Sequence, residues 1–139
     1  MKNVYAVDFK ANVGNYGNLV PLETNHTVPF SVKRVYYIYG VPSEMRRGFH
    51  AHIGLHQMLI CVHGSVKILT KTPFEEEIIT LDSPTTGLYI GPMIWREMFD
   101  FTEDAVLLVL ASEHYNEADY IRDYAKFEVM AKEYFKEAK

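Results

Sequence analysis

The sequence has a single cysteine, no long apolar run and no excess of positive charge, and each shortage excludes a class of protein. Cys61 alone cannot form a disulfide framework, so we expect a buried thiol in a cytoplasmic protein. The longest apolar run, 106–111, is far shorter than the roughly 20 residues that span a bilayer, and the amino terminus lacks the apolar stretch of a signal peptide. A formal net charge of −4 argues against general nucleic-acid binding. We therefore expect neither a membrane nor a nucleic acid as partner.

The composition indicates one folded domain over residues 1–139. The chain is 48% hydrophobic and 14% aromatic, which is enough for a sizeable core, and no linker or repeat divides it. The first hundred residues contain short β-branched and aromatic segments, separated by turn residues and without helical segments between them. The segments are VYAVDF, NLVPLE, VKRVYYIYG, FHAH, QMLICV, SVKIL, EEEIITL, GLYIG and AVLLVLA. We therefore predict an all-β fold, an antiparallel sandwich or barrel.

The carboxyl end shows a helical pattern instead. Apolar residues recur there at the spacing of one helix face, namely Tyr120, Tyr124, Phe127, Ala131 and Tyr134. Asn116 suits the N-cap, and Glu117 and Asp119 suit the positive end of the helix dipole. The pattern predicts a helix from Asn116 onward that packs on the sheet or against a second subunit.

Four of the few basic residues are close together in the sequence. Lys33, Arg34, Arg46 and Arg47 lie within 15 residues of one another in an otherwise acidic chain. Such a cluster suits a compact anion such as a diphosphate, because guanidinium groups bind phosphate oxygens in pairs. The alternative is a solvated, charged edge strand.

The stretch FHAH places His50 and His52 two residues apart on a predicted strand. Side chains alternate across a sheet, so the two imidazoles face the same side. They are candidates for metal ligands, for acid–base groups, or for polar residues with structural partners.

The spacing around these histidines resembles the first motif of the cupins, which are small double-sheet jelly rolls with an interior site. The motif is HxH, then a carboxylate, then glycine, and here Gln57 stands in the carboxylate position and Gly64 in the glycine position. The resemblance places the second motif at 87–95, where the last metal-ligating histidine is replaced by Arg96. A guanidinium repels a cation, so we expect no metal and no cofactor, which leaves the histidines free for proton transfer.

Within the cupins the chain resembles the dTDP-4-keto-6-deoxy-D-glucose 3,4-ketoisomerases, the metal-free FdtA/QdtA family. The stretches that carry the resemblance are KRVYYI, RGFHAH, LDSP and ADYIRDY, and it extends from about residue 5 to residue 130. It implies a cupin-type jelly roll with a C-terminal helix. It also implies a dTDP-linked keto sugar as substrate, whose ketone moves from C4 to C3 in the biosynthesis of dTDP-3-amino-3,6-dideoxyhexoses.

The resemblance also implies roles for individual residues. His50 is expected as the base that removes the C3 proton, with His52 as its partner, and histidine suits both roles because its ordinary pKa is about 6.5. Family likeness favours Tyr37 near the sugar, whereas strand alternation favours Tyr36, which shares the face of Arg34; a bulge would reconcile the two. Further candidates for nucleotide or sugar contacts are Arg34, Arg47, Gln57, Ser83, Tyr89 and Arg122. For Arg122 an ordinary ion pair on the helix is the alternative.

Two positions depart from the family pattern. Family members often carry arginine where this chain has Tyr16 and histidine where it has Arg96. We expect this pair to control which face of C4 receives the proton and to mark the D-gluco product; a D-galacto product is the alternative.

A homodimer is expected, because jelly rolls leave sheet edges that a second copy can cover. A dTDP-sugar epimerase, a non-catalytic sugar-nucleotide-binding cupin and a metal-dependent oxygenase are the rival interpretations.

Overall fold

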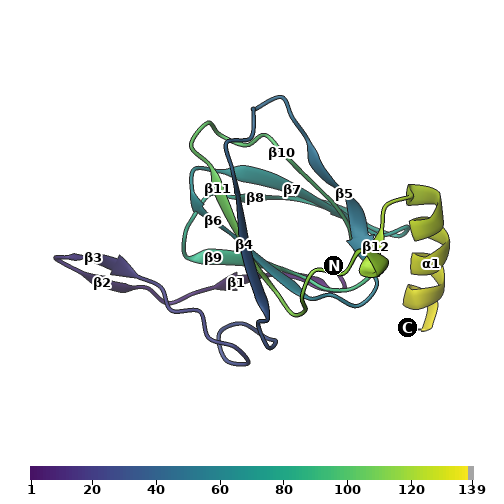
Figure 1. Ribbon diagram of the computed structural model, residues 1–139, viewed down its shortest axis with the longest axis horizontal. Coiled ribbons are helices and arrows are strands. Elements are labelled where there is room, and N and C mark those ends of the chain that lie inside the picture. The colour runs from purple at the N-terminus through teal and green to yellow at the C-terminus, as the bar shows by residue number, and fades with distance from the viewer. Residues whose placement is uncertain (138–139) are drawn as a thin grey trace.

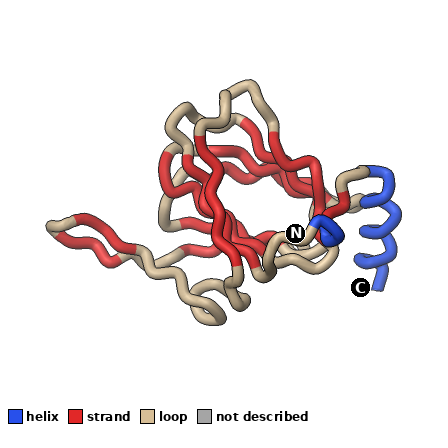
Figure 2. Tube along the Cα trace, in the orientation of Figure 1, coloured by secondary structure: helices blue, strands red, loops and turns tan. Residues whose placement is uncertain are grey.

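The computed structural model describes residues 1–137, which form two five-stranded antiparallel sheets and a C-terminal helix (Figures 1 and 2). The first sheet has the order β1 (Val4–Asp8), β9 (Thr86–Ile90), β6 (Gln57–His63), β11 (Val106–Ala111) and β4 (Arg34–Tyr39). The second has the order β12 (Tyr120–Ile121), β5 (Arg47–His52), β10 (Trp95–Phe99), β7 (Val66–Lys71) and β8 (Glu76–Leu81). The expected double-sheet jelly roll with a C-terminal helix is confirmed. Within the described residues the two sheets keep separate hydrogen-bond ladders.

The central strand β6 is buried on both faces, which explains its continuous apolar sequence. Leu59 and Cys61 contribute to the main core between the sheets. Met58 and Ile60 point the other way, into a second core that includes Phe9 and other residues of the N-terminal segment. Because both sides are covered, β6 reads as a run of apolar residues instead of an alternation.

The predicted helix starts later than expected. Asn116 does act as an N-cap, but of a 3₁₀ turn, η1 (Glu117–Asp119), and Tyr120 and Ile121 then pair with the edge of β5. Helix α1 (Tyr124–Glu137) begins only after Asp123, whose side chain accepts a hydrogen bond from the Ala125 amide. The apolar spacing could not distinguish these cases, because the unpaired edge of β5 offers the chain backbone partners that a helical turn would forgo.

Helix α1 covers one end of the second sheet. Phe127, Ala131 and Phe135 are its buried residues, and Phe127 packs against Trp95 of β10. Tyr134, which was expected on this face, is partly exposed. None of the helices in the described part of the chain is long and apolar enough to cross a membrane.

A short hairpin made of β2 (Asn12–Gly14) and β3 (Gly17–Leu19) projects away from the two sheets (Figures 1 and 2). Val13 and Leu19 are exposed on it, and Tyr16 at its turn is fully exposed. A two-stranded hairpin is marginally stable by itself, so these apolar side chains lack the packing that usually supports such an element.

Candidate active site

Strand β5 presents His50 and His52 to the interior beside a β-bulge. Arg96 pairs with His50 and Glu97 with Gly48, so Phe49 is the extra residue. Gly48 has φ 97°, and a Cβ there would lie 2.8 Å from the Arg96 carbonyl oxygen, so glycine is needed at this position. Beyond the bulge the alternation is regular, and the two imidazole rings lie 4.9 Å apart at nearly right angles.

His50 is anchored by the backbone of the bulge. Its Nδ1 lies 3.0 Å from the Gly48 carbonyl oxygen, which can only accept a hydrogen bond. Burial, and then the guanidinium of Arg96, lower the pKa of His50 to about 4. At neutral pH its ring is therefore uncharged and can accept a proton.

His52 is fully buried and is anchored by a carboxylate. Its Nδ1 lies 3.0 Å from Oδ2 of Asp119, while its Nε2 is buried and has no hydrogen-bond partner within residues 1–137. Burial and the charge of Arg96 hold the pKa of His52 far below its ordinary value. A buried polar atom without a partner costs stability, and such atoms often serve a ligand.

Arg96 lies beneath both histidines and has no exposed surface. Its Nε and Nη2 donate to the Ile94 carbonyl oxygen, and its Nη1 donates to Oε1 of Gln57. The Gln57 Nε2 in turn donates to the Tyr36 hydroxyl at 3.0 Å. Burial lowers the pKa of Arg96 to about 10, which still leaves it charged at neutral pH.

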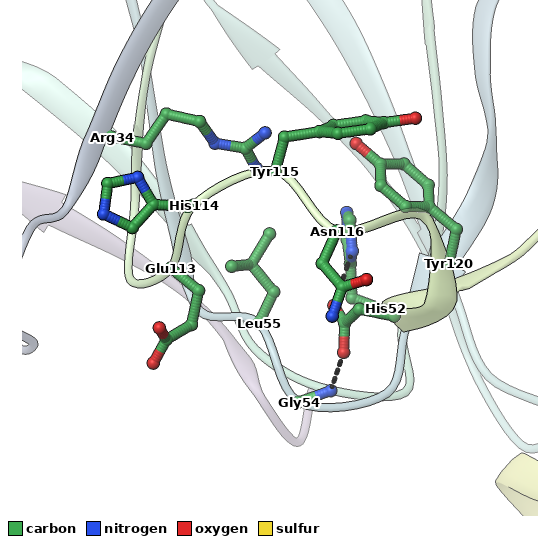
Figure 3. Close-up of a pocket in the computed structure, with 10 residues that line it drawn as sticks. Arg34, His52, Gly54, Leu55, Glu113, His114, Tyr115, Asn116 and Tyr120 are labelled. Atoms are coloured by element: carbon green, nitrogen blue, oxygen red, sulfur yellow. Dashed lines mark hydrogen bonds and ion pairs between the residues drawn. The ribbon is translucent and has the colours of Figure 1, made fainter.

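Two adjoining cavities lie above these residues. The first, of about 590 Å³, is lined by Arg34, His52, Gly54, Leu55, Glu113, His114, Tyr115, Asn116, Asp119 and Tyr120. In Figure 3, Arg34 and His114 lie on one side of it, and His52, Asn116 and Tyr120 on the other. The second, of about 430 Å³, is lined by Arg34, Val35, Tyr36, Ile38, Arg47, Gly48, His50, Met98, Tyr115, Tyr120 and Arg122. These volumes are those of small-ligand pockets.

Most of the predicted site residues meet here. The residues that line one of the cavities are His50, His52, Arg34, Tyr36, Arg47 and Arg122. Gln57 and Arg96 form the layer beneath. Arg122 is not on the helix, but it does form an ion pair, the alternative considered for it, since its Nε lies 2.7 Å from Oε1 of Glu117.

Tyr37 does not line either cavity. It lies on the outer face of β4, its side chain is 64% exposed, and its ring is beside that of Tyr39. The pairing of β4 with β11 runs from Arg34 to Tyr39 without a register shift, so no bulge turns Tyr37 inward. Strand alternation therefore identified the inward tyrosine, Tyr36. The expectation of Tyr37 at the sugar stays a prediction, and its place on the outer face does not favour it.

Three other candidates also lie away from the two cavities. Tyr89 hydrogen-bonds His56 and stacks on Tyr5. Ser83 hydrogen-bonds Thr85 within a turn. Tyr16, at the end of the projecting hairpin, does not reach the cavities of its own chain. Each was proposed from the family resemblance, which by itself does not show where a segment lies in space.

The remaining members of the basic cluster do not line the cavities and form ion pairs. Lys33 pairs with Glu113 and Arg46 with Glu97. Only the two arginines at 34 and 47 turn toward the cavities.

No group of three or more His, Cys, Asp or Glu side chains in residues 1–137 is arranged to hold a metal ion. Gln57 stands in the position of a cupin carboxylate ligand, and its side-chain oxygen accepts a hydrogen bond from Arg96. The side chain in the place of the last cupin ligand is therefore a cation, which does not suit a metal ion.

Sequence reasoning missed the segment that covers the histidines. Asp119, Tyr115 and Tyr120 come from the connection between β11 and α1, and both tyrosines line both cavities. Asp119 was assigned to a helix terminus, although it lies in the ADYIRDY stretch noted as characteristic. The pairing of β12 with β5 is what brings this connection over the site.

Comparison with known proteins gives concordant results. The family model described as FdtA: WxcM-like, C-terminal matches residues 2–132. A TDP-4-oxo-6-deoxy-alpha-D-glucose-3,4-oxoisomerase from Aneurinibacillus thermoaerophilus is 49% identical over 121 residues, which cover 87% of each chain.

Two solved structures are similar over nearly the whole chain. A variant of the 3,4-ketoisomerase QdtA from Thermoanaerobacterium thermosaccharolyticum, in complex with TDP-4-keto-6-deoxyglucose, has 54% identity, a TM-score of 0.94 and 96% coverage of both chains. The WlaRB TDP-quinovose 3,4-ketoisomerase from Campylobacter jejuni has 45% identity and a TM-score of 0.90, covering 93% of this chain and 99% of its own.

Proposed function

Since the chain belongs to the FdtA family, we propose that it is a sugar 3,4-ketoisomerase, an isomerase that converts dTDP-4-keto-6-deoxy-D-glucose to its 3-keto isomer. The observation that carries the proposal is the pair of uncharged imidazoles, His50 and His52, in adjoining cavities lined by arginines. The single buried thiol, Cys61, suits the cytoplasm as the place of this activity.

The reaction needs two proton movements, which two histidines can divide. One proton leaves C3, which the neighbouring C4 ketone acidifies, and a proton returns at C4 through an enediolate. The other leaves the C3 oxygen and reaches the C4 oxygen, so the ketone moves without any net change in oxidation state. We assign the carbon-bound proton to His50 and the oxygen-bound proton to His52. Positioned groups of this kind contribute roughly 10²–10⁴-fold each.

Arginines on two strands and on the connection between β12 and α1 suit the diphosphate of the nucleotide. Arg34, Arg47 and Arg122 surround the second cavity, and guanidinium groups bind phosphate oxygens in paired hydrogen bonds. The Tyr36 hydroxyl accepts from Gln57 and keeps its own proton, which it can donate to a sugar oxygen.

We further propose that the enzyme is a homodimer in which the β2–β3 hairpin packs on a second copy. The exposed apolar side chains of this hairpin need a surface, and the edge strand β4 exposes Val35, Tyr37 and Tyr39. In such a dimer Tyr16 can reach the partner's cavities, which it cannot do in its own chain. Light scattering of the purified protein tests the mass. Mixing a chain that carries Tyr16→Arg and His50→Asn with a chain that carries Arg96→His tests the exchange, because the D-galacto shift expected of the double change then appears only if the hairpin serves the other copy.

The configuration at C4 is assigned to Tyr16 and Arg96. Arg96 pairs with His50 across β10 and β5, so a change there alters the charge under the group that returns the proton. We propose the D-gluco product for this chain. The double change Tyr16→Arg with Arg96→His is expected to shift the product toward D-galacto, and an unchanged C4 configuration would refute the assignment.

Proton NMR of dTDP-4-keto-6-deoxy-D-glucose with the protein in D₂O, without added metal, tests the reaction itself. A new 3-keto sugar with deuterium at C4 is the expected result, and the H4–H5 coupling reports its configuration. Loss of turnover in His50→Asn, with TDP binding retained, is the matched control. No exchange at C3 and no new sugar would show that the chain binds sugar nucleotides without this chemistry.

A further inference from the structure

Asp119 lines the first cavity, and both of its carboxylate oxygens have hydrogen-bond partners. Oδ2 lies 3.0 Å from Nδ1 of His52, and Oδ1 accepts a hydrogen bond of 2.8 Å from the Gly54 amide. The Asp119 carbonyl oxygen also accepts from the Ile53 amide at 2.9 Å. Two side-chain contacts and one backbone contact therefore fix Asp119 to the end of β5 and the turn after it.

The contact between Asp119 and His52 determines which ring nitrogen carries the proton. A carboxylate can only accept, so the proton of the neutral imidazole must lie on Nδ1. Nε2 is then the bare acceptor. It is also the buried atom without a partner, in a side chain that lines the cavity. The tautomer that Asp119 imposes is the one that can take a proton from a ligand there.

The two histidines differ in the group that contacts their Nδ1 atom. The Nδ1 of His50 faces a neutral carbonyl, that of Gly48, whereas the Nδ1 of His52 faces a charge. A carboxylate stabilises an imidazolium more than a carbonyl does. His52, which also lies next to the cation Arg96, is the histidine that needs such support when it becomes protonated.

We propose that Asp119 is a positioning residue for the isomerisation: it holds His52 in the Nδ1–H tautomer and stabilises it while it carries the oxygen-bound proton between O3 and O4. The role of His52 rests on the proposed function, but the tautomer does not.

Nitrogen-15 NMR of the histidine-labelled protein tests the tautomer without substrate. The His52 signals, assigned by their loss in His52→Asn, are expected to show a protonated Nδ1 and an unprotonated Nε2. In Asp119→Asn the amide oxygen remains on the Gly54 amide, so the NH₂ group faces Nδ1 and forces the proton to Nε2. An Nε2–H tautomer in the unmodified protein, or the same tautomer in both proteins, would overturn the proposal.

Steady-state kinetics test the effect that this tautomer should have on turnover. Asp119→Asn is expected to lower kcat by roughly 10²–10⁴-fold, because the wrong tautomer removes one acid–base group. The dissociation constant for TDP is expected to change by less than about threefold, since Asp119 lines the first cavity and not the second, where Arg47 and Arg122 lie.

The chain offers a matched control in Asp104, whose carboxylate lies 3.4 Å from Nδ1 of the exposed His63. Asp104→Asn is expected to leave kcat unchanged. If the parent enzyme turns over and Asp119→Asn has the same kcat, the positioning role fails while the proposed function stands. If the parent does not turn over, the proposed function fails and the NMR result still decides the tautomer.

Discussion

Arg96 and His50 are directly opposed on β10 and β5, and the guanidinium is buried under the imidazole without a carboxylate hydrogen-bonded to it among the described residues. A buried cation with only neutral partners repels a second positive charge nearby and so disfavours protonation of the imidazoles. The site therefore keeps both histidines as proton acceptors, which is what an enzyme that begins by removing a proton from carbon requires.

The acid limit of activity should lie well below that of an ordinary histidine. His50 must be unprotonated to act, and its pKa is about 4, so kcat/KM should remain high as the pH falls through 6.5 and decline only near pH 4. A pH profile of kcat/KM measures this limb, with brief exposure to acid and activity recovered at pH 7 as the control for unfolding. A limb near pH 6.5 would contradict this picture of the site.

Replacing Arg96 with methionine should move that limb upward. After burial, Arg96 is the largest cause of the lowered pKa of His50, so its removal should raise that pKa, while burial keeps it below 6.5. The same pH profile on Arg96→Met measures the change. Lys67→Met, which removes an exposed cation paired with Asp100, should leave the limb in place. An unmoved limb in Arg96→Met would mean that burial alone sets the pKa.

The neighbouring tyrosines of β4 should respond differently to loss of the hydroxyl. Tyr36→Phe removes the group that ends the Arg96–Gln57 chain in the cavity and should lower kcat by roughly 10²-fold. Tyr37→Phe, on the outer face, should change kcat by less than about twofold. Steady-state kinetics of the two variants side by side make the measurement, and equal losses would place Tyr37 at the substrate after all.

Helix α1 should contribute strongly to stability through one residue. Phe127 is fully buried against Trp95 and Tyr124, and its replacement by alanine should lower the free energy of unfolding by about 3–5 kcal/mol. Urea unfolding followed by circular dichroism measures the loss. Val129→Ala, on the exposed side of the same helix, should cost less than about 1 kcal/mol. Similar losses in both would show that the helix does not dock as described.

Sequence patterns were sufficient to predict features that depend only on neighbouring residues, such as the direction of side chains along a strand. Period-two alternation placed His50 and His52 on one face and chose Tyr36 over Tyr37, because neighbouring side chains on a strand point to opposite sides. The strand pattern predicted an all-β sandwich or barrel, and the family resemblance supplied the cupin type and the reaction. The same reasoning could not set the start of α1, since Tyr120 and Ile121 pair with β5, a contact with a distant segment that local spacing does not indicate.

Tertiary structure alone decided how the site is assembled. Asp119 contacts His52 across 67 residues of sequence because β12 pairs with β5. The spacing of residues around Asp119 does not predict that pairing. The inward direction of Arg96 and its contact with Gln57 depend on β10 and β6 belonging to opposing sheets. The sequence by itself determined which side chains can perform the chemistry; the packing of one sheet on the other determined which of them meet, because contacts between distant segments exist only once the sheets have formed.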